Sequence, residues 1–159
     1  MRVLFVCLGN ICRSPTAEGV MRSLLARDGE SGIEVDSAGT GGWHVGEAPD
    51  ARATEAARRR GIRLEGQARQ VSQRDFAEFD LILAMDGSNQ HALRQLAPDE
   101  HCHMKVKLLR EFDPASAEAQ NLDVPDPYYG GPAGFDDVLD LVQAACEGLL
   151  EHIRSLQTA

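Results

Sequence analysis

The sequence predicts an α/β fold built around a parallel β-sheet. Short apolar runs alternate along the chain with stretches whose apolar residues recur at helical spacing, and this alternation is typical of the α/β class. The first run, residues 2–7 (RVLFVC), is apolar and β-branched with no polar residue in alternate positions. Such a run indicates a strand that is buried on both faces, as strands of parallel sheets are.

Local patterns predict the remaining elements in turn. A helix should run from Arg13 to about Ala26, because the apolar residues of this stretch recur at helical spacing and Pro15 falls in the first turn, where proline is tolerated. Further strands are expected at 32–37, 79–86 and 105–109, and further helices at 50–60, at 88–96 and from about 135 to 156. The Pro-, Asp- and Gly-rich stretch 113–134 is long for a connection, which predicts a functional loop.

Length, composition and charge narrow the class of protein. The 159 residues fit a single domain, expected to span 1–159, and 43% hydrophobic with 26% charged residues is ordinary for a folded chain. The apolar run from Val3 to Val6 is too short for a signal peptide or a membrane span, and the four cysteines are sparse, so we expect a cytoplasmic protein with reduced thiols. A net charge of −9 disfavours nucleic acid and anionic membranes as partners.

The segment CLGNICRS (7–14) predicts a phosphate site where the first strand turns into the first helix. Open α/β sheets bind ligands at this edge, and the helix that begins near Arg13 adds its positive end. Gly9 and Asn10 tolerate left-handed backbone geometry, so the loop can turn its N–H groups inward as an anion nest. The predicted substrate-binding residues of this loop are Leu8, Gly9, Asn10, Ile11, Cys12 and Ser14.

The spacing of Cys7 and Arg13 predicts nucleophilic chemistry on the bound phosphate. Arg13 follows Cys7 by six positions, so the curled loop places a guanidinium fork opposite the sulfur, where it can hold two phosphate oxygens. The positive field of the site favours the thiolate of Cys7, the form that acts as a nucleophile. Ser14 is placed to donate its hydroxyl to that sulfur.

Transfer of a phosphoryl group to sulfur also requires an acid that protonates the leaving oxygen. Asp126 is the candidate, because it lies in the long loop within VPDPYYGG (124–131), where Pro125 and Pro127 restrict the backbone on either side. An Asp before Pro also commonly opens a turn, and from spacing alone both interpretations stay open. Tyr128 and Tyr129 follow directly; two such rings can wall a cleft and stack on an aromatic substrate, but adjacent tyrosines are more often half-buried packing residues, and both interpretations stay open here.

Taken together, these motifs resemble the low-molecular-weight protein tyrosine phosphatase family. CLGNICRSPTAEGV (7–20) and DPYYGG (126–131) carry the resemblance, and the blocks at 36–50, 61–70 and 79–86 lie between them in the family's order. The resemblance implies a four-stranded parallel sheet with helices on both faces, with the phosphate-binding loop between the first strand and the first helix. It also implies hydrolysis of phosphate monoesters through a cysteinyl-phosphate intermediate on a phosphotyrosine-containing protein or a small aryl phosphate, with inorganic phosphate as product.

The resemblance further implies residue roles. Cys7 would be the nucleophile, Arg13 the phosphate clamp, and Asp126 the acid that later activates water. Asn10, Ser14 and Ser37 would brace the loop by hydrogen bonds. Trp43, Tyr128 and Tyr129 would shape the rim of the pocket. The chain departs from animal members at Gly66, where they carry a histidine in the bracing network, so the support of the loop should differ.

Relatives with the same loop have other activities, and together with a non-catalytic interpretation they give three alternatives. A thioredoxin-coupled arsenate reductase needs two further cysteines close together after the third strand, and residues 79–89 contain none. A protein-arginine phosphatase carries a threonine where this chain has Ile11, whose apolar side chain better suits an aromatic ring. A catalytically idle phosphate-binding module would not need Cys7, Arg13 and Asp126 together.

No metal or cofactor is expected. His101, Cys102 and His103 are adjacent, but in a strand-like segment neighbouring side chains point to opposite faces, and the sequence offers no second ligand pair. Cys12 lies five residues after Cys7 in the same loop, so we also expect redox sensitivity, in which a disulfide between the two protects the oxidised nucleophile.

Overall fold

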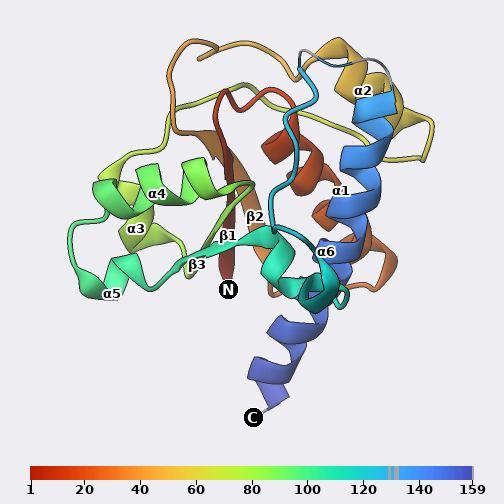
Figure 1. Cartoon of the computed structure of the whole chain (residues 1–159). Helices are drawn as coiled ribbons and strands as arrows, with labels where there is room; N and C mark the ends of the chain where they lie inside the picture. The colour runs from red at the N-terminus through yellow and green to blue at the C-terminus, as the bar shows by residue number, and fades with distance from the viewer. Residues whose placement is uncertain (129, 131–132, 159) are drawn as a thin grey trace.

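The sheet is the centre of the fold. The computed structural model describes residues 1–128, 130 and 133–158. Its strands are β1 (Arg2–Cys7), β2 (Glu34–Gly39), β3 (Leu81–Ala84) and β4 (Val106–Leu108), all parallel and in the order β2-β1-β3-β4 (Figure 1). The predicted four-stranded parallel sheet is therefore confirmed.

Helices cover both faces of this sheet (Figure 1). The helices α1 (Arg13–Arg27), α2 (Ala51–Arg58) and α6 (Ala133–Thr158) pack on one face, and α3 (Gln73–Glu78), α4 (Gly87–Leu96) and α5 (Glu100–His103) pack on the other. Two short 3₁₀ helices, η1 (Leu109–Phe112) and η2 (Ser116–Glu118), follow β4. The chain is thus a single three-layer α/β domain.

The sequence of β1 explains why the sheet needs both layers. Successive side chains of a strand point to opposite faces, and Val3 and Phe5 enter the core under α1 and α6 while Leu4 and Val6 enter the core under α3 and α4. All four side chains are fully buried. Burying an apolar side chain stabilises a fold by about 1.5–3 kcal/mol. Any register that exposed one face of this strand to solvent would therefore strongly destabilise the fold.

The register of β1 places its carboxyl end in the middle of the sheet edge. Cys7 pairs with Gly39 at the end of β2, and Val6 pairs with Ala84 at the end of β3. The loops that leave these strands consequently meet at one edge, which is where parallel sheets bind their ligands.

Several predicted boundaries were wrong. The second strand starts at Glu34 rather than residue 32, and the third is shorter than 79–86 because Phe79 ends α3 and Asp86 caps α4. The helix α3 was not predicted; its start is fixed by a capping box between Ser72 and Asp75.

The segment at 101–103 is also different from the prediction. His101, Cys102 and His103 lie in the helix α5 and not in a strand-like segment, so the argument from alternating strand faces does not apply to them. The start of this helix is set by Asp99, whose carboxylate accepts a hydrogen bond from the Cys102 N–H. Across the described residues, no helix combines the length and the hydrophobicity needed to cross a membrane.

Candidate active site

The loop that joins β1 to α1 curls around the sulfur of Cys7. We call residues 7–13 the phosphate loop. Asn10 has a left-handed backbone with φ of +58°, and its N–H donates to Cys7 Sγ at 3.3 Å. The curl passes so close to β2 that a Cβ added at Gly39 would stand 2.7 Å from the Leu8 carbonyl oxygen. Glycine is therefore required at position 39 for the loop to lie as it does.

The sulfur of Cys7 has a second polar neighbour on its buried side. Ser14 Oγ lies 3.0 Å from Cys7 Sγ, and both side chains are almost fully buried. A hydroxyl and a backbone N–H directed at one sulfur stabilise its anionic form, because each donates toward the negative charge.

Asn10 connects this arrangement to the neighbouring strand. Its side-chain amide donates to Ser14 Oγ at 2.9 Å and to Ser37 Oγ at 3.0 Å, and Ser37 in turn donates to Glu18 Oε1 at 2.7 Å. Burial raises the pKa of Glu18 above its ordinary value, although Ser37 and Arg22 act in the opposite direction. Gly66 stands where the sequence comparison with animal members led us to expect a difference in the support of the loop. It has φ of +90° and open space where a Cβ would stand, so residue 66 contributes no side chain to the hydrogen bonds that brace the loop.

Arg13 is held in place by groups from distant parts of the chain. Its side chain is 4% exposed, and its guanidinium contacts Asp86 Oδ2 at 2.6 Å, the Val124 carbonyl oxygen at 3.1 Å and Asp126 Oδ2 at 3.6 Å. Burial disfavours the charged guanidinium, but the nearby negative groups, Cys7 and Asp86 foremost, outweigh it and raise the pKa of Arg13. The fork is thus fixed and fully charged at the end of the phosphate loop.

Asp126 opens a turn and also lies beside Arg13. Its Oδ1 accepts a hydrogen bond from the Tyr128 N–H at 3.0 Å, which is the turn-opening contact of an Asp, while Oδ2 faces Arg13. The side chain is 41% exposed and lies on the wall of the pocket that contains Cys7. The turn therefore fixes the carboxyl where it faces the phosphate loop.

These residues enclose a cavity of about 300 Å³. Its mouth carries the exposed ring of Trp43, which passes over Gly41 so closely that a Cβ there would stand 1.9 Å from a ring carbon. The lining consists of Cys7, Leu8, Gly9, Ile11, Cys12, Arg13, Trp43, His44, Asp126 and Tyr128. A deep cationic end and an aromatic mouth suit an aryl phosphate.

Cys12 shares this cavity with Cys7 but differs from it chemically. Burial, followed by the negative charges of Asp50, Cys7 and Asp126, raises the pKa of Cys12 to about 12. At neutral pH Cys12 is therefore a thiol and not a competing nucleophile.

Most of the site residues predicted from the sequence lie around the cavity. The side chains of Asn10 and Ser14 do not line the cavity; they hydrogen-bond to each other, and Asn10 also donates to Ser37. Tyr129 lies outside the described residues. Three contributors to the site were not predicted from the sequence: Asp86, which contacts Arg13; His44, which lines the cavity; and the backbone of Arg69, whose N–H donates to Asn10 Oδ1 at 3.0 Å. Asp86 had a usable signal, since it ends the strand-like run FDLILAMD at the same sheet edge.

Comparisons with known proteins agree with this geometry. The family model of the low molecular weight phosphotyrosine protein phosphatases matches residues 2–158. A low molecular weight protein-tyrosine-phosphatase of Streptomyces coelicolor is 51% identical over 154 residues, which cover 96% of this chain and 93% of that protein.

Solved structures give the same result. A protein tyrosine phosphatase from Entamoeba histolytica, crystallised with Hepes in its active site, superposes with a TM-score of 0.93 at 38% identity and covers 99% of both chains. DARP, the drosophila arginine phosphatase, superposes with a TM-score of 0.85 at 35% identity, covering 96% of this chain and 98% of its own. The chain belongs to the low molecular weight phosphotyrosine protein phosphatase family, and it is a protein-tyrosine phosphatase, a phosphoric monoester hydrolase.

Proposed function

We propose that Cys7, Arg13 and Asp126 carry out the hydrolysis, with Cys7 as nucleophile, Arg13 as phosphate clamp and Asp126 as acid and base. One observation carries the assignment. Cys7 Sγ receives the Asn10 N–H at 3.3 Å and lines the same cavity as the Arg13–Asp126 pair, whose charged groups are 3.6 Å apart. The nucleophile, the cation and the carboxyl therefore face one space in which a phosphate fits.

The reaction proceeds in two displacements. In the first, the Cys7 thiolate attacks phosphorus, the bond to the substrate oxygen breaks, and the departing oxygen takes the proton of Asp126. In the second, the Asp126 carboxylate takes a proton from water, the resulting oxygen attacks phosphorus, and the bond to sulfur breaks to release inorganic phosphate. Arg13 and the backbone N–H groups of the phosphate loop stabilise the charge on the equatorial oxygens in both steps.

The walls of the cavity favour an aromatic leaving group. Within the phosphate loop, Ile11 contributes an apolar side chain to the cavity lining, and Trp43 and Tyr128 provide rings at the mouth. Phosphotyrosine in a protein, or a small aryl phosphate, places its ring among these groups. The four cysteines are free thiols, which supports the cytoplasmic location expected from the sequence.

Initial rates on matched peptides test this proposal. Peptides carrying phosphotyrosine, phosphoserine or phosphoarginine are compared at equal concentration, with phosphate release measured for the wild type and Cys7→Ser. We expect phosphotyrosine to be strongly preferred and Cys7→Ser to be inactive. Preference for phosphoarginine, or arsenate reduction coupled to thioredoxin in a parallel assay, would reassign the substrate; turnover by Cys7→Ser within tenfold of wild type would refute the nucleophile.

A further inference from the structure

The amide of Asn10 is oriented by the backbone of Arg69. Asn10 Oδ1 accepts the Arg69 N–H at 3.0 Å, so the Nδ2 group must face the other way, where it donates to Ser14 Oγ and Ser37 Oγ. An Asn side chain that received no N–H at Oδ1 would be free to flip and would present an acceptor to Ser14. The Arg69 N–H therefore determines which groups donate and which accept along this chain of hydrogen bonds.

The orientation of Asn10 decides what Ser14 does with its proton. Because Ser14 Oγ accepts from Asn10, its single hydroxyl proton is left for Cys7 Sγ at 3.0 Å or for the more distant Ala38 carbonyl oxygen at 3.4 Å. The shorter contact directs the proton to sulfur. A donor at this position stabilises the thiolate and later the sulfur as a leaving group.

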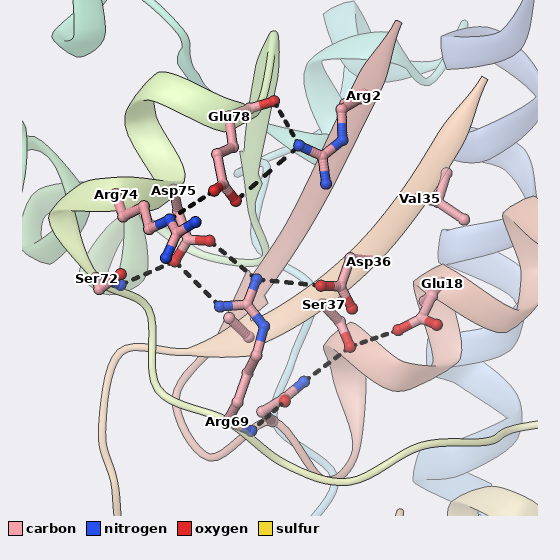
Figure 2. A network of polar contacts seen from close by, with 12 residues as sticks. Arg2, Glu18, Val35, Asp36, Ser37, Arg69, Ser72, Arg74, Asp75 and Glu78 are labelled. Atoms are coloured by element: carbon pink, nitrogen blue, oxygen red, sulfur yellow. Dashed lines mark hydrogen bonds and ion pairs between the residues drawn. The ribbon is translucent and has the colours of Figure 1, made fainter. Parts of the chain in front are cut away.

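The side chain of Arg69 anchors its own backbone. Its guanidinium meets both carboxylate oxygens of Asp75 at 3.0 and 3.1 Å and also reaches Asp36 Oδ2 at 3.1 Å (Figure 2). The Asp75 carboxylate has a side-chain exposure of only 6% and accepts the Ser72 N–H at 2.9 Å in the cap of α3. A planar fork on a fixed carboxylate restricts both distance and angle, which a lysine ammonium does not.

The backbone on either side of this anchor is tied to β2. The Arg69 carbonyl oxygen accepts the Gly39 N–H at 2.8 Å, and the Val71 N–H donates to the Gly39 carbonyl oxygen at 2.8 Å. Arg69 thus joins α3, β2 and the phosphate loop at one point, as Figure 2 shows for its ion pairs. A shift of this segment would move the N–H that faces Asn10.

We propose that Arg69 is a positioning residue for catalysis, which acts through its fork on Asp75 to fix the N–H that orients Asn10 and directs the Ser14 hydroxyl to Cys7. The inference rests on the proposed role of Cys7 as nucleophile. It extends the site to a residue whose side chain does not line the cavity and contacts no reacting atom.

The test compares Arg69→Lys and Asp75→Asn with the matched control Glu78→Gln. Glu78 lies on the same helix and pairs with the exposed Arg74 at 2.7 Å, away from the phosphate loop (Figure 2). For the two test variants we expect kcat on an aryl phosphate to fall about tenfold, as misplacement of a catalytic group does. The control should match wild type.

A second readout separates positioning from stability. The rate of Cys7 alkylation by iodoacetamide is measured against pH at a temperature well below the unfolding midpoint of every variant. Loss of the Ser14 donor should move the midpoint of this profile upward by about one pH unit, the equivalent of one hydrogen bond to sulfur. A change in unfolding temperature alone does not move it. In an Asn10→Ala background, Arg69→Lys should cause no further shift.

Each possible outcome of these experiments either supports or contradicts the positioning role of Arg69. If Arg69→Lys does not fold, Asp75→Asn decides, because an asparagine still accepts the Ser72 N–H. If kcat and the alkylation midpoint of the folded variants match Glu78→Gln, the inference is wrong although the Cys7 assignment stands. Absence of Cys7-dependent turnover in the wild type would instead remove the proposed function itself.

Discussion

Replacing Asp86 by asparagine separates the contribution of Asp86 to the position of Arg13 from its contribution to the fold. Asp86 has two contacts that matter: Oδ2 lies 2.6 Å from Arg13 Nη1, and Oδ1 accepts the Asn89 N–H at 2.7 Å as the cap of α4. Asparagine caps helices as well as aspartate does, so Asp86→Asn keeps the cap and removes the charge. The predicted loss of activity therefore comes from the lost contact with Arg13.

The geometry sets the size of this loss. A hydrogen bond between charged partners contributes about 1.5–3 kcal/mol, and breaking a fully buried ion pair costs about 3–5 kcal/mol. The lower range applies here, because Asp86 is 22% exposed and Asp126 stays 3.6 Å from the guanidinium. If the transition state bears the whole loss, kcat/KM falls by about 10- to 100-fold.

Steady-state hydrolysis of an aryl phosphate and urea unfolding measure the two effects. The matched control is Asp99→Asn, the same substitution at the cap of α5, far from the site. Its free energy of unfolding should stay within about 0.5 kcal/mol of wild type. A variant Asp86→Asn whose kcat/KM lies within twofold of wild type would show that Arg13 does not need its carboxylate partner, and the argument from the 2.6 Å contact would be wrong.

Four further predictions concern the pocket itself. Cys7→Ser should abolish turnover yet bind inorganic phosphate with nearly wild-type affinity by calorimetry, since the N–H groups remain; weakened binding would place the sulfur in recognition. Asp126→Ala should slow aryl phosphates with poor leaving groups by ~10²–10⁴-fold and good ones less, so equal losses would exclude protonation by this carboxyl. Because the pKa of Cys12 is about 12 and the thiolate forms only as the pH rises, a fraction of about 10⁻⁴ of Cys12 is ionised at pH 8. Mass spectrometry after mild alkylation at pH 8 should therefore find Cys7 modified and Cys12 unmodified, and labelling of Cys12 would contradict this expectation. Peroxide should inactivate the enzyme by forming a Cys7 sulfenic acid, which Cys12 converts to a disulfide with release of water; a dithiol should then restore wild type more fully than Cys12→Ser, and equal recovery would exclude a protective disulfide.

The parts of the fold that the sequence predicted depend on local patterns. The apolar run of β1, the glycine and asparagine of the phosphate loop and the apolar spacing of α1 all lie within residues 2–27. A strand followed by a tight turn and a helix needs no long-range information, so both the elements and the position of Cys7 and Arg13 at their junction followed from neighbouring residues.

The parts that were missed depend on which strands become neighbours. Asp86 reaches Arg13 only because β3 lies beside β1, and Arg69 reaches Asn10 only because its segment bridges to the end of β2. Neither pairing has a periodic signal in the sequence. The helix α3 was missed for a related reason, because a helix of six residues is too short to show an apolar stripe.

The charges around Arg13 give two carboxylates different tasks in the proposed mechanism. Without substrate, the buried guanidinium of Arg13 is balanced by Asp86 on one side and by Asp126, at 3.6 Å, on the other. In the proposed mechanism, a phosphate dianion bound at the loop replaces the Asp126 carboxylate as the partner of the guanidinium. Asp86 carries a different task, because it keeps Arg13 in place while the second partner changes.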